Sequence, residues 1–185
     1  MQNADVILVD KTLEGDTEAF SKLVHKYQKY LYGFLIKITF SKEDTEDIFQ
    51  ETFIRTYNNL YKYDSRWAFS TWLCKIAINV SKNYYKKKKY STCCYDEMPD
   101  VQCDSKDFPE IAFEAKDKKK QILKLINSLS FEQKTAVCLR YFHDFEYKEI
   151  GRIMEVSSDA AKMKVQRAKK LLYERIENLI EEGVI

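Results

Sequence analysis

Apolar residues recur at helical spacing through the first half of the chain. One run extends from Asp16 to about Thr39, a second begins near Lys42, and a third begins near Phe69. Asp16 and Ser41 suit N-cap positions, because their side-chain oxygens can accept hydrogen bonds from free first-turn amides. The pattern predicts three amphipathic helices packed as one bundle. The positions predicted to be buried are Phe20, Leu23, Val24, Tyr27, Leu31, Phe34, Ile38, Ile48, Phe49, Phe53, Tyr57, Leu60, Phe69, Trp72, Leu73, Ile76 and Val80.

A second helical bundle is predicted after a break in the pattern at residues 90–115, which contain Pro99 and Pro109. Its first helix buries Ile122, Leu125, Ile126 and Leu129, and its second carries Ala136, Val137, Leu139 and Tyr141. A short helix, Tyr147–Met154, and a long one, Ser158–Glu181, follow. We therefore expect an all-α protein with two small helical domains, residues 1–89 and 116–185, joined by a flexible acidic linker, residues 90–115.

Charge is segregated along the chain, although 31 Lys and Arg nearly balance 29 Asp and Glu. Residues 75–89 carry six lysines and no acid, and residues 162–175 carry six cations against one acid. The predicted linker carries seven acids and one lysine. Two basic blocks around an acidic one indicate two nucleic-acid contacts joined by a tether. Either block alone is also compatible with a solvated helix face.

The segment from Tyr147 to Leu172 has the pattern of a helix-turn-helix. Ile150 and Ile153 would pack the first helix and Val156 the turn, while Ala161, Val165 and Ala168 would seat the second helix. The opposite face is then available to DNA, and near the helix start its side chains can reach base edges in the major groove. Lys169 and Lys170 suit phosphates. The exposed face consists of Ser158, Asp159, Lys162, Met163, Gln166, Arg167 and Lys170. An ordinary helical hairpin with a basic face is the alternative.

The helix that starts near Phe69 offers a second basic face, opposite its buried stripe. Before it lies a loop, residues 63–68, in which Arg66 and Trp67 are neighbours. Aromatic side chains beside cations suit single-stranded nucleic acid, because bases stack on the rings while the cations neutralise phosphates. Trp72 belongs to the apolar stripe, whereas Trp67 is either a base-contacting residue or a core residue. The residues on the basic face are Lys75, Asn79, Lys82, Asn83 and Lys86.

The helix near Lys42 has the opposite charge, with five acids and no cation between residues 43 and 54. Asp44, Asp47 and Glu51 share one side, with Gln50 beside them. Such a ridge suits a basic protein partner. Part of it also complements the positive end of the helix dipole, which accounts for Asp44 but not for Glu51.

Several function classes find no support in the sequence. The N-terminus lacks the pattern of a signal peptide, and no apolar run is long enough to span a membrane, so we expect a cytoplasmic protein. His25 and His143 have no evident catalytic partner, and no phosphate-binding glycine loop occurs. We expect no enzyme activity, cofactor, metal or small-molecule substrate. Cys93, Cys94 and Cys103 lie close together without a metal-binding spacing, which leaves a redox or metal role for them undecided.

Four segments resemble the extracytoplasmic-function group of sigma factors, within the sigma-70 family. The first domain of that group is similar to GDTEAFSKLVHKYQKYLYGFL, KEDTEDIFQETFIRTYNNL and FSTWLCKIAINVSKNYYKK in this chain. The second is similar to INSLSFEQKTAVCLRYFHDFEYKEIGRIMEVSSDAAKMKVQRAKKLL. The segments TEDIFQETF and FSTWLCKIAIN are specific, whereas the helix-turn-helix alone is a weak signal. The segments also occur in the order that the group has.

The resemblance implies partners and roles. The acidic helix would dock on core RNA polymerase through Asp47, Gln50 and Glu51. The loop and the basic helix would open and read the promoter minus-ten element, with Trp67, Asn79, Lys82 and Asn83 at the matching positions. The last helix would read the minus-thirty-five element through Lys162, Met163, Gln166 and Arg167. An anti-sigma factor is a further implied partner.

This chain departs from the pattern of the group at five positions. Trp67 replaces a small residue, Phe131 replaces a proline, and Glu155 lies where glycine is frequent. Ala160 and Met163 occupy positions that often carry hydroxyl groups, which affects the base preference of the last helix. The alternative function is a helix-turn-helix regulator that binds duplex DNA without polymerase. That alternative explains the second domain equally well, but it gives no reason for the acidic ridge or the aromatic loop.

Overall fold

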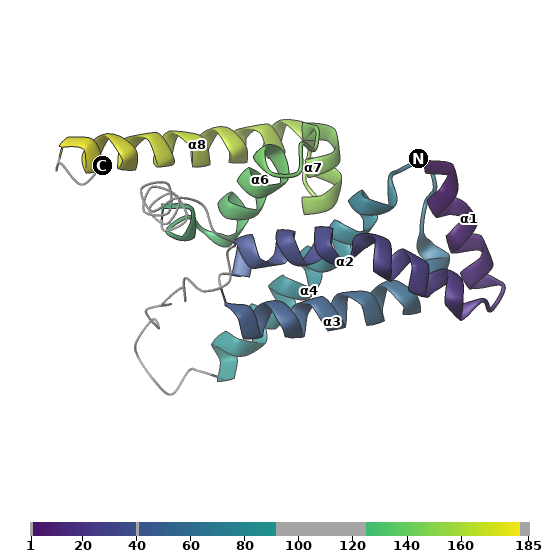
Figure 1. Cartoon of the computed structure of the whole chain (residues 1–185). Coiled ribbons are helices and arrows are strands. Elements are labelled where there is room, and N and C mark those ends of the chain that lie inside the picture. Colours follow the sequence, from purple (N-terminus) through teal and green to yellow (C-terminus); the bar gives the residue numbers. More distant parts are fainter. Residues whose placement is uncertain (1, 40, 92–124, 182–185) are drawn as a thin grey trace, which may run out of the picture. The chain divides into compact units, whose positions relative to one another are not determined.

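The computed structural model describes residues 2–39, 41–91 and 125–181, and every regular element within these ranges is a helix (Figure 1). The all-α prediction is therefore confirmed. The chain divides into two compact units, Met1–Asp100 and Val101–Ile185. Unit 1 contains α1 (Gln2–Leu13), α2 (Thr17–Thr39), α3 (Lys42–Asn58), the 3-10 helix η1 (Leu60–Lys62) and α4 (Phe69–Ser91). Unit 2 contains α6 (Phe131–Tyr141), α7 (Tyr147–Met154) and α8 (Ser158–Glu181).

Polar residues start the helices of unit 1 where the sequence predicts. The Asp16 carboxylate accepts hydrogen bonds from the amides of Glu18 (2.9 Å) and Ala19 (3.1 Å) at the start of α2. Ser41 caps α3 by accepting from the amide of Asp44 at 3.2 Å. These bonds satisfy amides that have no partner inside a helix, which fixes where each helix begins.

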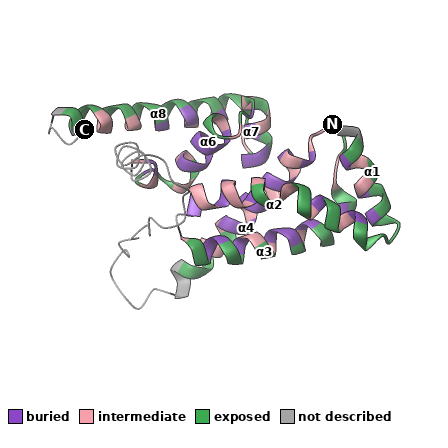
Figure 2. Ribbon diagram, viewed as in Figure 1, coloured by how far each residue is buried: buried purple, intermediate pink, exposed green. Residues whose placement is uncertain are grey.

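The core of unit 1 forms around α2, which packs against α1, α3 and α4. Most positions of the predicted stripes are buried, and Figure 2 shows them in purple. Six of them are only half-buried, namely Phe20, Val24, Tyr27, Phe49, Trp72 and Ile76. Tyr57 alone is exposed, at 45%, and its ring contacts Phe20 edge-on, with 4.9 Å between the ring centroids. The prediction that Tyr57 is a core residue was therefore wrong. The fully buried large side chains of this unit are Leu23, Leu31, Phe34, Leu35, Ile38, Ile48, Leu60, Phe69, Leu73 and Ile78.

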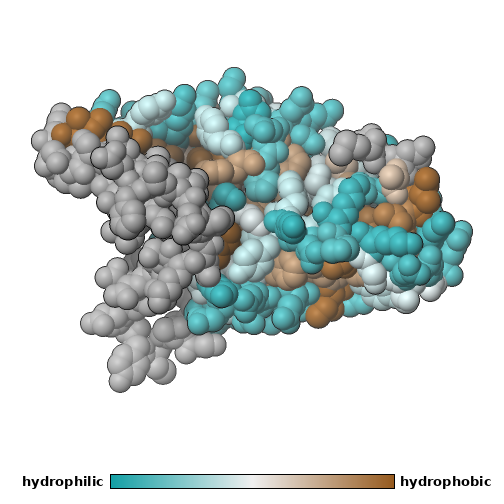
Figure 3. All heavy atoms as spheres, in the orientation of Figure 1, coloured by the Kyte–Doolittle hydropathy of each residue, from teal (hydrophilic) through white to brown (hydrophobic). Residues whose placement is uncertain are grey.

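The sequence pattern predicts three helices in this bundle, and α1 is a fourth helix that it does not predict. In α1 the polar side chains of Asp5 and Thr12 are buried, whereas the apolar side chains of Ile7 and Leu13 are about half exposed. The hydrophobic colour that Figure 3 shows at α1 agrees with this. A search for an apolar stripe misses such a helix, since Asp5 and Thr12 share its inward face with Val9. Asp5 is tolerated there because Lys26 and Tyr27 of α2 bind its carboxylate.

In the described part of unit 2, Ile126 and Leu129 are the first buried side chains. Ser130 then forms a capping box with Gln133 at the start of α6. The predicted core residue Ile122 lies outside the described residues. Tyr90 and Ser91 belong to α4, and the remainder of the predicted linker to residue 115 lies outside the described residues. The same is true of Cys93, Cys94 and Cys103.

Helices α7 and α8 form the predicted helix-turn-helix. The seating residues Ile150, Ile153, Ala161, Val165 and Ala168 are all buried, at 0–1% exposure. Val156 in the turn is half-buried rather than fully enclosed. The turn also requires close backbone approach: a Cβ atom added at Gly151 would lie 2.8 Å from the Val156 carbonyl oxygen. The prediction of this motif is therefore confirmed for its five seating residues, whereas Val156 is less buried than predicted.

No helix in the described part of the chain combines the length and the apolar character needed to cross a membrane.

Candidate nucleic-acid interfaces and the acidic ridge

The outward face of α8 carries the candidate base-reading residues. All seven side chains predicted for it have solvent access, and Met163 is 46% exposed. The Ser157 hydroxyl starts the helix by accepting from the amide of Ala160 at 3.1 Å. The structure therefore brings Ser158, Asp159, Lys162, Met163, Gln166, Arg167 and Lys170 together on the exposed side of one helix, opposite the residues that seat it.

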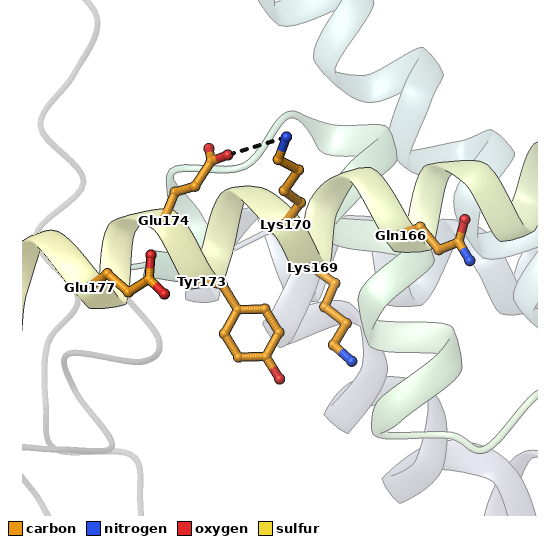
Figure 4. Close-up of a pocket in the computed structure, with 6 residues that line it drawn as sticks. All are labelled: Gln166, Lys169, Lys170, Tyr173, Glu174 and Glu177. Carbon is orange, nitrogen blue, oxygen red and sulfur yellow. Dashed lines mark ion pairs between the residues drawn. The ribbon is translucent and has the colours of Figure 1, made fainter.

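Further along α8, two side-chain pairs lie on opposite edges of the helix, as Figure 4 shows. Lys170 forms an ion pair with Glu174 at 3.7 Å, and the Lys169 ammonium lies 5.3 Å from the centroid of the Tyr173 ring. Both contacts are at the surface, where such pairs hold their side chains only weakly. The lysines are therefore free to exchange these partners for phosphate oxygens. The residues around the open hollow drawn in the figure are Gln166, Lys169, Lys170, Tyr173, Glu174 and Glu177.

Helix α4 separates a buried side from a basic side, as predicted. Cys74 and Ile78 are fully buried on the inner side, and burial raises the pKa of the Cys74 thiol to about 12. This thiol is therefore a core group rather than a reactive one. Lys75, Asn79 and Lys82 are half-buried, whereas Asn83 and Lys86 are exposed. The cationic groups consequently become more accessible toward the C-terminal end of α4.

The loop before α4 is held together by hydrogen bonds within its own backbone and side chains. Arg66 makes a two-pronged contact with the Asp64 carboxylate at 2.9–3.1 Å, and this hydrogen bonding raises the pKa of the Arg66 guanidinium. The Arg66 side chain is nevertheless 84% exposed. Trp67 is half-buried. Its carbonyl oxygen accepts a hydrogen bond from the Tyr63 hydroxyl at 2.7 Å.

The acidic ridge on α3 is smaller than predicted. Asp47 and Gln50 are exposed and Glu51 is half-buried, but Asp44 is only 6% exposed. Tyr84 and Lys88 of α4 bind the Asp44 carboxylate at 3.0 Å and 2.9 Å. Asp44 therefore joins α3 to α4 and does not belong to the exposed ridge, because a desolvated carboxylate requires such partners. The ridge that remains is Asp47, Gln50 and Glu51.

The ridge carboxylates also have intramolecular partners, which the sequence did not reveal. Tyr84 donates to Asp47 at 3.1 Å as well as to Asp44, and Arg55 pairs with Glu51 at 2.6 Å. Burial, followed by the bonds to these two aspartates, raises the pKa of the Tyr84 hydroxyl. The i,i+4 spacing of Glu51 and Arg55 could have indicated their pairing. No local pattern connects Tyr84 to α3, since the two are distant in sequence.

Comparisons with known proteins identify both units. Residues 23–90 match the family model of Sigma-70 region 2, and residues 119–172 match that of Sigma-70, region 4. The ECF RNA polymerase sigma-E factor of Haemophilus influenzae is 29% identical, with 97% of this chain and 98% of the relative covered. The RNA polymerase sigma-H factor of Pseudomonas aeruginosa is 28% identical, with 98% of both covered.

Solved structures agree on the fold. The sigma factor RpoE from Bartonella quintana, in complex with the anti-sigma factor NepR, gives a TM-score of 0.74 at 19% identity, covering 87% of this chain and 98% of that one. CnrH, in complex with the cytosolic domain of CnrY, gives 0.69 at 18% identity, covering 95% and 98%.

Two helical units, one with a helix-turn-helix and the other with a basic helix behind an aromatic loop, define a DNA-binding protein of transcription initiation. The two family matches and the near full-length relatives then make the assignment specific: the chain belongs to the sigma-70 family of sigma factors, in its extracytoplasmic-function group. The alternative of a polymerase-independent regulator is not supported, because it leaves the region 2 match unexplained.

Proposed function

We propose that this chain binds core RNA polymerase, recognises promoter minus-ten and minus-thirty-five elements, and promotes strand opening for transcription initiation. The observation that carries the proposal is that region 2 and region 4 matches occur in order on one chain, each on a unit with an exposed basic face. A duplex-only DNA-binding protein needs just one of these units. A protein that both holds polymerase and selects promoters needs both.

Each domain takes one share of this function. Residues 1–89 bind polymerase and the minus-ten element, residues 90–115 connect the domains, and residues 116–185 bind the minus-thirty-five element. On unit 1, strand contacts fall to the loop and to α4, because stacking surface and cations lie there together. These residues are Arg66, Trp67, Lys75, Asn79, Lys82, Asn83 and Lys86. On unit 2, Lys162, Met163, Gln166 and Arg167 read base edges, while Lys170 contacts phosphate.

Further partners and the setting follow from the family. RpoE of Bartonella quintana was solved with the anti-sigma factor NepR, and we infer that an anti-sigma factor also binds this chain. The catalytic step of transcription belongs to the polymerase, so the chain itself is not an enzyme. Its place of action is the cytoplasm, where the polymerase and the chromosome are found.

The polymerase contact provides the direct test. Asp47 and Gln50 are exposed, and Glu51 retains partial access, so a basic partner surface can reach all three. Reversing charge at two of them, Asp47→Lys with Glu51→Lys, is expected to weaken binding to core polymerase roughly tenfold or more, because like charges then face each other. Affinity is measured with fluorescently labelled full-length protein titrated with core polymerase.

A matched control variant separates the effect of the mutated positions from the effect of the change in net charge. Glu43→Lys with Glu46→Lys makes the same change of net charge at two exposed acids of α3 outside the ridge. This control is expected to bind polymerase within about twofold of the unmodified protein, because surface charges off the contact contribute little. Equal affinities for the ridge variant and the control would refute the proposed docking site.

A further inference from the structure

Helix α1 is joined to α2 by a buried polar group. Asp5 of α1 is 5% exposed, and its carboxylate binds the Lys26 ammonium and accepts from the Tyr27 hydroxyl at 2.7 Å. Helix α1 also contacts η1, the element directly before the loop. Residues 2–13 precede the stretch that matches Sigma-70 region 2, whereas Lys26 and Tyr27 lie within that stretch.

Aromatic rings extend the connection from Asp5 toward the loop. The Tyr27 ring lies 5.1 Å from the Phe69 ring, and Phe69 lies 5.4 Å from the Tyr63 ring. Tyr63 also contacts Trp72 at 5.5 Å. Burial, and then the neighbouring Asp5 charge, raise the pKa of the Tyr63 hydroxyl. That hydroxyl donates to the Trp67 carbonyl oxygen at 2.7 Å.

We propose that α1 braces this loop, with Asp5, Tyr27 and Tyr63 acting as positioning residues for promoter opening. The hydrogen bond from the Tyr63 hydroxyl fixes the backbone carbonyl group of Trp67. The Asp5 carboxylate fixes Tyr27, Phe69 packs against Tyr27, and Tyr63 packs against Phe69. A loop held in one conformation captures an unstacked base without first having to be ordered. The inference rests on the proposed function, because it concerns the same loop.

Tyr63→Phe is the sharpest test, since it removes the hydroxyl and keeps the ring. With the full-length protein and core polymerase, promoter opening is followed by the permanganate reactivity of promoter thymines. Opening is expected to slow about threefold to tenfold, the range for one lost hydrogen bond. Binding in the closed complex and the melting temperature of the protein are expected to change little. If Tyr63→Phe lowered the opening rate, closed-complex binding and the melting temperature together, Tyr63 would have only a structural role and the brace would be refuted.

Asp5→Asn provides a second variant at the other end of the brace. It preserves the shape of the side chain and is expected to slow opening in the same direction. If both residues act through one set of contacts, the double variant will slow opening by less than the product of the two single effects. Independent, multiplying effects would overturn the proposal. Tyr61→Phe is the matched control, because Tyr61 is 68% exposed and belongs to the neighbouring η1.

Trp67→Ala separates failure of the brace from failure of the proposed function. If Trp67→Ala slows opening while Tyr63→Phe and Asp5→Asn behave normally, the brace is refuted and the loop keeps its proposed role. If all three variants open promoters normally, both the brace and the assignment of the loop to strand opening are wrong. Slow opening in all three, with the Tyr61→Phe control unaffected, supports both.

Discussion

At the scale of single residues, Gly151 and Gly33 both lie inside helices but have very different surroundings. A Cβ atom at Gly151 would meet backbone atoms of the helix-turn-helix, with the Val156 carbonyl oxygen at 2.8 Å and the Ser158 nitrogen at 3.2 Å. At Gly33 the nearest atom is the end of the Lys37 side chain, at 3.9 Å. Backbone cannot move aside as a lysine can, so the two positions should respond to alanine with opposite signs.

We expect Gly151→Ala to destabilise unit 2. Forcing an extra carbon into a packed turn costs about 1–3 kcal/mol, which exceeds the roughly 1 kcal/mol that alanine contributes over glycine in a helix. Gly33→Ala, the control, should stabilise unit 1 by up to about 1 kcal/mol. Urea denaturation of the full chain measures both. A stable Gly151→Ala protein with normal affinity for minus-thirty-five DNA would contradict this account of the turn.

Glu155 is a second residue where the turn imposes a special conformation. Its backbone lies in the left-handed region, with φ of 60°, at the C-cap of α7. Glycine adopts this conformation without steric cost, which agrees with the expectation of glycine at this position from the family resemblance. The sequence identified the position as unusual, and the structure supplies the backbone angle that makes it so.

At the scale of elements, α8 divides its exposed face between two kinds of DNA contact. Lys162 lies in the second turn of the helix, Gln166 about one turn later, and Lys170 about one turn beyond Gln166. The pair between Lys170 and Glu174 is exposed, with 80% and 52% of the side chains accessible, so it opposes a phosphate contact only weakly. The two groups should therefore be separable by mutation.

Lys162→Ala or Gln166→Ala should relax discrimination at one or two positions of the upstream element. The expected loss is about 1–3 kcal/mol for each bidentate base contact. Lys170→Ala should weaken binding to all sequences alike and reduce the salt slope by about one. Fluorescence anisotropy on matched and mismatched duplexes at several salt concentrations measures these quantities. Identical behaviour of Lys162→Ala and Lys170→Ala would contradict the division of the face.

Most elements could be predicted because local rules determine them. Cap residues such as Asp16 and Ser41 mark helix starts, and apolar spacing marks buried faces. Helix α1 could not be predicted, because its inward Asp5 depends on Lys26 and Tyr27 of another helix. The same limit applies to the candidate sites. Their exposed faces follow from periodicity, but contacts between distant residues, such as those that bury Asp44, require the fold.

At the scale of the whole molecule, each unit has its own core and its own accessible basic face, which we propose as a nucleic-acid contact. Placing both on one chain makes the second binding event intramolecular once the first has occurred. Two modest contacts can then select one promoter, because only a sequence that offers both elements engages both units. Because the affinity for a promoter is shared between two contacts, neither basic face needs to be extensive.

The order of packing in unit 1 has a further consequence, which concerns folding rate. Helix α1 packs on α2, α2 on α3, and α3 on α4, so consecutive helices are neighbours in space. Chains with such local contacts fold in microseconds to milliseconds, because each contact closes only a short loop. The described helices contain no proline, so slow proline isomerisation should not limit their formation.

Stopped-flow refolding of the full chain, followed by tyrosine and tryptophan fluorescence, should therefore be complete within about a second, with most of the amplitude in milliseconds. A dominant phase of tens of seconds would contradict this. A fast-folding chain can complete unit 1 while the ribosome is still adding unit 2, since synthesis proceeds at only about 5–20 residues per second. The delay between message and usable protein would then be set by translation alone.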